Sequence, residues 1–119
     1  MNAPLPTQAV RRPLPPIVTE KLKALFGERL STAEAVRDHH GRDESPYPPL
    51  LPDAVVFART TGEVAELVRI AADHRVPVIP YGVGTSLEGH LLALEGGISI
   101  DLSQMNAVLA VNPEDLTAT

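Results

Sequence analysis

The sequence predicts an α+β fold in which two short helices precede a strand–helix–strand unit and further short strands. Nine of the twelve prolines lie at or before Pro52, and regular apolar periodicity begins only after that residue. A helical apolar stripe then lies between two short apolar runs, residues 54–57 and 78–79. We therefore expect a Pro-rich lead-in with short helices over residues 1–52 and the main domain over residues 53–119.

Two short helices are expected within the lead-in region. The first covers residues 17–26, where apolar side chains recur at helical spacing, with Thr19 as its N-cap and Gly27 as its end. The second begins at Ser31, because Ser-Thr-Ala-Glu has the form of a capping box, and runs to about His39. Four more prolines follow and favour an extended or turning linker.

The strand–helix–strand unit is the most regular part of the sequence. Residues 54–57 form a short apolar strand, and Thr60 and Glu63 have the spacing of a capping box at the start of the helix. Pro77 disfavours helix at the residue before it, so the helix ends first and residues 78–79 form the second strand. Such a unit implies two parallel strands joined by a right-handed crossover. The apolar stripe of the helix consists of Val64, Leu67, Val68, Ile70 and Ala71.

Further short strands are expected after this unit. Residues 97–102 alternate apolar and polar side chains, which is typical of a half-buried strand. Residues 107–111 form another apolar run, and Asn-Pro-Glu-Asp at residues 112–115 is typical of a turn. The main domain is therefore expected to combine one helix with several short strands.

The composition excludes several classes of function. The formal net charge is −5, so the chain has no electrostatic reason to bind DNA, RNA or anionic lipid. Cysteine is absent, which excludes disulfides, thiolate nucleophiles and cysteine-ligated metals. No apolar run approaches the roughly 20 residues of a transmembrane helix, and the Pro-rich N-terminus lacks the apolar core of a signal peptide. We therefore expect a cytoplasmic location.

The loop over residues 80–89 carries the strongest indication of function. It follows a strand and contains three glycines, together with the adjacent hydroxyls of Thr85 and Ser86. Glycine admits positive φ angles, so successive amides can converge on one point, and its lack of a Cβ lets a bulky oxyanion come close. No Lys or Arg lies in the loop, so an anion would be held by amide and hydroxyl dipoles. Such donors suit a phosphate or a pyrophosphate.

Two well-known phosphate-binding patterns are absent from this loop. The P-loop requires Gly-Lys followed by Ser or Thr, and no lysine occurs after Lys23. The Rossmann pattern Gly-x-Gly-x-x-Gly would require glycine where Leu87 stands, and Gly89 lies too far along the chain. On spacing alone, a glycine-rich turn that binds nothing stays as good an interpretation as a phosphate site.

The longer string of residues around the loop resembles a known family. The similar segments are Ala-Val-Val-Phe at 54–57, Thr-Thr-Gly-Glu-Val at 60–64, Val-Pro-Val-Ile-Pro-Tyr-Gly-Val-Gly-Thr-Ser-Leu-Glu-Gly-His at 76–90 and Gly-Gly-Ile-Ser-Ile-Asp-Leu-Ser-Gln-Met-Asn at 96–106. They resemble the FAD-binding domain of the vanillyl-alcohol oxidase/p-cresol methylhydroxylase superfamily, most of all its D-lactate dehydrogenase and glycolate oxidase FAD-subunit branch. The resemblance implies that residues 53–119 form the N-terminal lobe of a PCMH-type FAD-binding domain.

The resemblance also implies FAD as the cofactor and gives roles to the loop. In the family the loop equivalent to residues 81–86 wraps the FAD pyrophosphate largely through backbone amides, and Gly89 lets the chain turn away. Thr85 stands where some members carry a histidine that binds flavin covalently, so non-covalent FAD is implied. His90 could touch the flavin, and a turn residue at the loop exit is an equal alternative. The implied cofactor-binding residues are Tyr81, Gly82, Val83, Gly84, Thr85, Ser86, Gly89 and His90.

The activity implied by the resemblance is the oxidation of a 2-hydroxyacid of the D-lactate or glycolate type, with a hydride passing to the flavin. The family's enzymes run to several hundred residues, so we expect this chain to be a truncated FAD-binding segment that is inactive alone. Two alternatives stay open. One is a non-enzymatic remnant, or half of a split protein that a partner chain completes. The other is a small module that binds phosphorylated ligands.

Other polar residues are weaker candidates. His39 and His40 are adjacent, and adjacent helical residues point about 100° apart, which favours a solvated helix end over a shared metal ion. Asp101 follows an apolar strand and is expected to serve a strand-end turn. Ser86 and His90 could pair, but the nucleophile-elbow pattern Gly-x-Ser-x-Gly is absent. We therefore assign no catalytic residue and no metal ligand.

Overall fold

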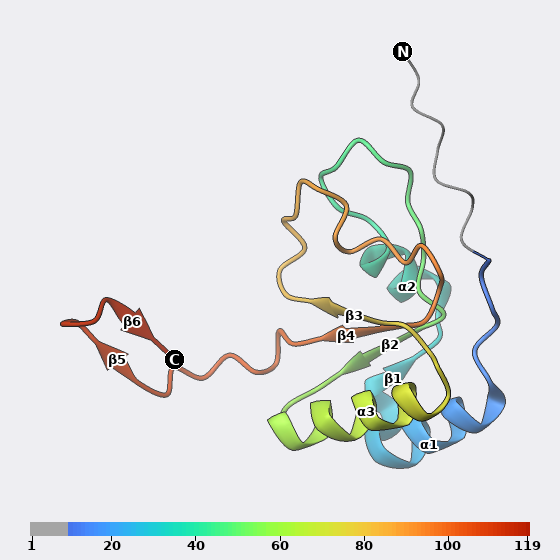
Figure 1. The fold of residues 1–119 in the computed structure, drawn as a ribbon, viewed down its shortest axis with the longest axis horizontal. Helices are drawn as coiled ribbons and strands as arrows, with labels where there is room; N and C mark the ends of the chain where they lie inside the picture. Colours follow the sequence, from blue (N-terminus) through green and yellow to red (C-terminus); the bar gives the residue numbers. More distant parts are fainter. Residues whose placement is uncertain (1–9) are drawn as a thin grey trace.

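A four-stranded mixed sheet forms the centre of the molecule (Figure 1). The computed structural model describes residues 10–119, so residues 1–9 of the expected lead-in lie outside the described residues. The strand order is β1-β2-β4-β3, in which β2, β4 and β3 are parallel and β1 is antiparallel to β2. The strands are β1 (Leu30–Ser31), β2 (Ala54–Phe57), β3 (Val78–Tyr81) and β4 (Ile98–Asp101). The expected α+β class is confirmed.

Three helices flank this sheet. Helices α1 and α3 lie together on one side, and α2 lies on the other (Figure 1). None of the helices in residues 10–119 has the length and apolar character needed to cross a membrane. Their bounds are α1 (Pro16–Phe26), α2 (Glu34–His40) and α3 (Thr61–Asp73), and a short 3₁₀ helix, η1 (Gly27–Arg29), follows α1.

The starts of the first two helices differ from the sequence prediction. α1 begins with Pro16 at its first position and has no side-chain cap, so the expected capping by Thr19 is wrong. Proline serves well there because its φ is already helical and it has no amide to satisfy. The capping box at Ser31 is also wrong, because Ser31 belongs to β1 and α2 begins only at Glu34. The expected end of α1 at Gly27 is confirmed.

The start of α3 follows the prediction. Thr60 Oγ1 accepts a hydrogen bond from the Glu63 amide at 3.1 Å, as in a capping box. The Glu63 carboxylate accepts from the Arg59 amide at 2.7 Å and from both terminal nitrogens of Arg29, at 2.8 and 2.7 Å. This bidentate pair ties the segment after α1 to the first turn of α3.

The Arg29–Glu63 pair makes the stability of the fold sensitive to pH in the acid range. Hydrogen bonds from Arg29 and from the Arg59 amide lower the pKa of Glu63 from 4.5 to about 2. A carboxyl whose pKa falls on folding stabilises the fold above its unfolded-state pKa, and this contribution is lost as the pH falls through the folded pKa. We expect the free energy of unfolding in urea to decline between pH 4.5 and pH 2, and to decline less in Glu63→Gln. An equal decline in both proteins would contradict this account.

β4 lies between the two strands of the strand–helix–strand unit. Ile98 stands opposite Ala54 of β2 and opposite Val78 of β3, so β2 and β3 are parallel, as expected, but not adjacent. All four residues of β4 are buried, including the polar Ser99 and Asp101. The alternation of apolar and polar residues therefore marks a central strand buried on both faces and not the half-buried strand that we expected.

The core is aliphatic and lies between the sheet and the α1–α3 pair. Because aromatic residues make up only 3% of the chain, branched aliphatic side chains supply most of the packing. Leu67 of α3 is fully buried, whereas Val68, predicted on the same stripe, is 46% exposed. The core residues are Val18, Leu22, Phe26, Val56, Ala58, Leu67, Ile70, Ala71, Ile98 and Ile100.

The C-terminal segment forms a small hairpin apart from the sheet (Figure 1). Its strands are β5 (Val111–Asn112) and β6 (Thr117–Ala118), so the predicted strand at 107–111 is wrong except for its last residue. The turn forms where it was expected. The side-chain oxygen of Asn112 accepts hydrogen bonds from the amides of Glu114 and Asp115.

Candidate functional site

The candidate site lies where the three parallel strands end. Phe57, Asp101 and Tyr81 close β2, β4 and β3 in the same register, so the carboxyl ends of these strands meet at one edge of the sheet. The loop over residues 82–90 leaves β3 at this edge (Figure 1). In open sheets of parallel strands, ligands bind outside the carboxyl ends. The loop that the sequence singled out therefore lies where this fold favours a ligand.

Five successive amides of this loop, those of residues 82–86, donate no hydrogen bond within the part of the chain that the structure describes. Gly82, Val83 and Thr85 are exposed, and no atom lies within 4 Å of a Cβ placed on Gly82. Amides left open in this way are tolerated where water or a ligand reaches them. The loop thus offers a row of donors with room for an anion.

Gly84 gives the loop its bend. Its φ is 75°, in the left-handed region that glycine adopts without strain. A Cβ at this position would overlap the hydroxyl of Tyr81, whose ring is buried beneath the loop. The same hydroxyl lies 3.3 Å from Nε2 of His39 on α2. Gly84 therefore rests directly on Tyr81, and the position of the loop depends on that ring.

The loop exit is held by short-range contacts and by the linker before β2. Ser86 Oγ lies 2.9 Å from Nδ1 of His90, and the Ser86 carbonyl accepts from the Glu44 amide at 3.1 Å. The Ser86–His90 pair considered from the sequence is therefore present. Among residues 10–119, however, nothing hydrogen-bonds the second ring nitrogen of His90, whereas a nucleophile–base pair needs a third group to orient the base. The pair therefore fastens the loop exit.

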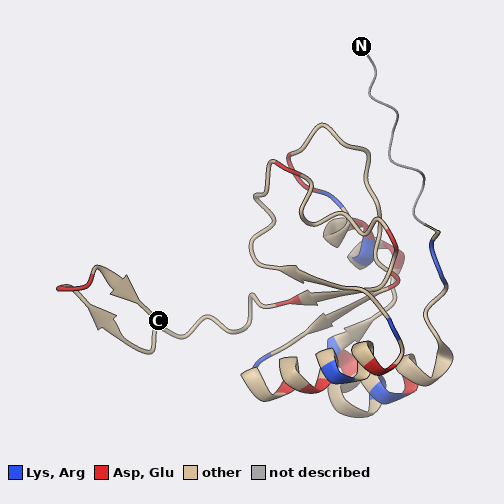
Figure 2. Ribbon diagram, viewed as in Figure 1, with Lys and Arg blue, Asp and Glu red and all other residues tan. Residues whose placement is uncertain are grey.

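A hollow of about 530 Å³ separates the loop from α2. Four of the eight predicted site residues line it, while Gly82 lies beside them in the loop and the other three stand at the loop exit. Arg42 lies across the hollow and is paired with Asp38 at 2.7 Å, and the loop itself has no Lys or Arg (Figure 2). Three carboxylates, those of Asp38, Asp43 and Glu44, also line the hollow, so the backbone amides of the loop, and not the side-chain charges, are the groups that favour an anion there. The lining consists of Ala35, Asp38, His39, Arg42, Asp43, Glu44, Tyr81, Val83, Gly84 and Thr85.

Below the loop lies a buried pair that sequence reasoning missed. His40 Nε2 lies 2.8 Å from Asp101 Oδ2, and His40 Nδ1 lies 2.8 Å from the Val36 carbonyl. The two residues are 3% and 4% exposed, so the expected solvated helix end is wrong for His40. Asp101 also accepts from the Ser103 amide at 2.8 Å, which is the turn role expected for it. The partners are 61 residues apart, and no local pattern in the sequence could have joined them.

Within residues 10–119, no group of three or more His, Cys, Asp or Glu side chains is arranged to hold a metal ion. The adjacent histidines of α2 instead take different partners, Tyr81 for His39 and Asp101 for His40. This division follows from the angle between neighbouring helical side chains.

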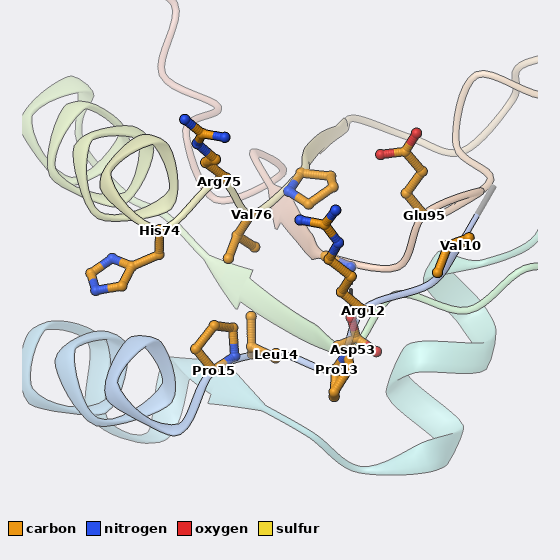
Figure 3. Close-up of a pocket in the computed structure, with 12 residues that line it drawn as sticks. Val10, Arg12, Pro13, Leu14, Pro15, Asp53, His74, Arg75, Val76 and Glu95 are labelled. Carbon is orange, nitrogen blue, oxygen red and sulfur yellow. Dashed lines mark hydrogen bonds between the residues drawn. The ribbon is translucent and has the colours of Figure 1, made fainter.

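A second cavity, of about 430 Å³, lies at the opposite edge of the sheet (Figure 3). It is lined by residues that precede the parallel strands and by the extended segment before α1. Asp53 accepts there from the Gly97 amide at 2.7 Å and from Arg11 at 3.2 Å, so its charge is already met. None of the predicted site residues lines this cavity.

The chain matches a protein family described as "FAD binding domain" over residues 52–119. The chain belongs to this family. It is 41% identical over 114 residues to the probable mitochondrial D-lactate dehydrogenase of Danio rerio, a match that covers 95% of this chain and 22% of that protein. It is 37% identical over 103 residues to glycolate oxidase subunit GlcD of Bacillus subtilis, a match that covers 86% of this chain and 22% of that protein. The chain thus spans about a fifth of the length of these relatives.

Solved structures share the fold. Alkyldihydroxyacetonephosphate synthase superposes with a TM-score of 0.77 at 28% identity, over 92% of this chain and 25% of that one. p-Cresol methylhydroxylase superposes with a TM-score of 0.70 at 22% identity, over 82% of this chain and 20% of that one. The expected PCMH-type architecture is therefore confirmed, as is the relation to D-lactate dehydrogenase and the glycolate oxidase subunit.

Proposed function

We propose that this chain cradles the diphosphate of FAD in an oxidoreductase that acts on a 2-hydroxyacid of the D-lactate or glycolate type. The observation that carries the proposal is the row of open amides at residues 82–86, at the carboxyl edge of the parallel strands. The substrate class is supported by the relatives, which are named D-lactate dehydrogenase, glycolate oxidase subunit and D-2-hydroxyglutarate dehydrogenase. Each of these names refers to a hydroxyl on the carbon next to a carboxylate.

The amides of residues 82–86 are proposed to donate to the diphosphate oxygens, with the exposed Thr85 hydroxyl as a further donor. Charge-assisted hydrogen bonds of this kind contribute about 1.5–3 kcal/mol each. Tyr81 supports the bend from below, and Gly89, with a φ of 79°, turns the chain away at the exit. His90 is exposed beside that turn, where it could reach the flavin.

FAD, when bound, supplies the chemistry by accepting the hydride from the hydroxyacid carbon. The residues of this chain supply binding and orientation, and we assign no catalytic residue among them. The chain is therefore proposed to be inactive on its own. Oxidation would require polypeptide that contributes a substrate pocket and a base.

The binding of FAD is proposed to be non-covalent. Thr85, which stands where some members of the family carry the histidine that binds flavin covalently, has no nitrogen or sulfur nucleophile. Acid precipitation of the FAD-loaded protein, followed by centrifugation, tests this point. The flavin colour is expected in the supernatant, and colour retained in the washed pellet would contradict the proposal.

The role of the diphosphate can be tested by comparing three flavins. We expect fluorescence titration of the full chain to give the affinity order FAD, then FMN, then riboflavin, because they offer two phosphates, one and none to the loop. ADP is expected to compete with FAD for the same donors. Equal affinity for FAD and riboflavin, or a lack of competition by ADP, would contradict binding through the diphosphate.

A second candidate is half of a split protein, and the C-terminal hairpin favours it. Apolar side chains stand exposed on and around the hairpin, with Leu116 at 92%, and Val108, Leu109 and Val111 are also exposed. Such a surface suits cover by another polypeptide. If a separate chain supplies the rest of an FAD domain, adding it should increase FAD affinity and bury the hairpin. FAD affinity that is unchanged by any such chain would favour the simple cofactor-binding segment.

A further inference from the structure

We propose that the buried His40–Asp101 pair positions the glycine-rich loop by fixing the ring of Tyr81, on which Gly84 rests. Asp101 is the last residue of β4, and Tyr81 stands opposite it at the end of β3. His40 is the last residue of α2 and reaches across to both. The pair thus joins the lead-in region to the sheet directly beneath the proposed diphosphate site.

The pair is a buried hydrogen-bonded contact between α2 and β4. Both ring nitrogens of His40 lie 2.8 Å from an oxygen, one from the Val36 carbonyl and the other from the Asp101 carboxylate, so the imidazole is fixed from both sides. Burial raises the pKa of Asp101, but hydrogen bonds from Ser103 and His40 outweigh burial and hold the pKa below its usual value. Asp101 is therefore an anion fixed by two donors, and it sets the orientation of the imidazole.

The imidazole in turn holds Tyr81. The ring centroids of His40 and Tyr81 are 4.3 Å apart, and the Phe57 ring packs against His40 in a T-shaped arrangement at 5.7 Å. Tyr81 is buried, and its hydroxyl reaches up to His39 and to the underside of Gly84. Each group in the series Asp101, His40, Tyr81, Gly84 contacts the next. Displacement of the imidazole would leave the Tyr81 ring without its support and the loop free to move.

A purely structural role is the competing interpretation, since a buried pair between α2 and β4 also stabilises the fold. The chain offers a matched control for that role. Asp53 likewise accepts from one backbone amide, that of Gly97, and from one side chain, that of Arg11, although the Asp53 side chain is 21% exposed and that of Asp101 is 6% exposed. It lies at the opposite edge of the sheet, away from the loop. Asp101→Asn and Asp53→Asn therefore make the same chemical change at the two ends of the sheet.

The test measures loop order and FAD affinity beside thermal stability. We expect ¹⁵N relaxation of the full chain to show increased motion of the amides of residues 82–86 in Asp101→Asn and not in Asp53→Asn. Affinity for FAD should fall about tenfold in Asp101→Asn, the equivalent of part of one charge-assisted hydrogen bond, and stay unchanged in Asp53→Asn. Both variants should have a lower Tm. An ordered loop in Asp101→Asn, or equal effects of the two changes on the loop, would overturn the proposal.

A second variant covers the case in which Asp101→Asn fails to fold. His40→Gln keeps an amide donor that can reach Asp101 but removes the ring that supports Tyr81, so the loop should become mobile while the fold is retained. A folded His40→Gln protein with an ordered loop would overturn the proposal. The affinity measurement rests on the proposed function, whereas the relaxation measurement needs no ligand. A wild-type chain that fails to bind FAD would therefore refute the proposed function and leave loop order to decide this inference.

Discussion

Replacement of Gly84 by valine is expected to abolish detectable FAD binding. The φ of 75° places a β-branched residue in a strained region, and its Cβ would overlap the Tyr81 hydroxyl. The bend must then open, which displaces the amides of residues 82–86 that are proposed to donate to the diphosphate. Loss of two charge-assisted hydrogen bonds, at about 1.5–3 kcal/mol each, lowers affinity by roughly a hundredfold or more. Fluorescence titration with FAD measures the effect.

Gly27→Val is the matched control for this change. Gly27 also has a positive φ, 55°, but it ends α1 and no atom lies within 4 Å of its added Cβ. We expect this variant to lose stability through backbone strain while it keeps its affinity for FAD. Undiminished FAD binding by Gly84→Val, or equal losses of affinity in both variants, would show that the bend at Gly84 is not the feature that holds the cofactor.

Leu67→Ala is expected to destabilise the fold by about 2–5 kcal/mol, because it removes a fully buried side chain from the contact between α3, α1 and the sheet. A loss of that size is a large part of the total stability of a small domain. Urea denaturation followed by circular dichroism gives the change in the free energy of unfolding. The substitution should lower the urea concentration at the midpoint of unfolding without changing the slope of the free energy of unfolding against urea concentration.

Val68→Ala in the same helix provides the comparison. Val68 is 46% exposed, so the same kind of truncation removes little buried surface, and a change within about 0.5 kcal/mol is expected. Leu67 and Val68 are neighbours in the predicted apolar stripe, and only the structure shows that one is buried and the other is exposed. Equal destabilisation by both changes would mean that α3 packs with a different face on the sheet.

The elements that sequence reasoning predicted well are those with strong local signals. β2 has the predicted bounds, and its apolar run begins after Pro52 and Asp53 and ends, one residue beyond the strand, before Arg59. The cap at Thr60 was predictable because its hydrogen bond joins residues three apart. Gly27 ended α1 for an equally local reason, the need for a left-handed residue after the helix.

The errors arise where distant residues decide the outcome. The expected capping box at Ser31 does not form, because Ser31 belongs to the edge strand β1 and pairs there with Val55 of β2. The apolar run at residues 107–111 contributes only Val111 to a strand, and this residue pairs with Ala118 of β6. Hydrophobic pattern alone cannot show which partner a segment will find.

The candidate site divides in the same way. The loop and its glycines were apparent from composition and from the resemblance, since the signal lies in consecutive residues. The His40–Asp101 pair beneath the loop was not apparent from the sequence, because the two residues come from separate regions of the sequence and meet only in the folded chain. Asp101 in a buried strand was the one local hint, because an ionised side chain in such a place requires a partner.

Backbone amide shifts during titration of the ¹⁵N-labelled full chain test the central claim most directly. With FAD, and separately with inorganic pyrophosphate, the largest shifts are expected at the amides of residues 82–86, the row of donors that the protein itself leaves open. Shifts concentrated instead around Arg12 and Arg75, at the cavity on the opposite edge of the sheet, would contradict the account. So would a loop that does not respond to either ligand.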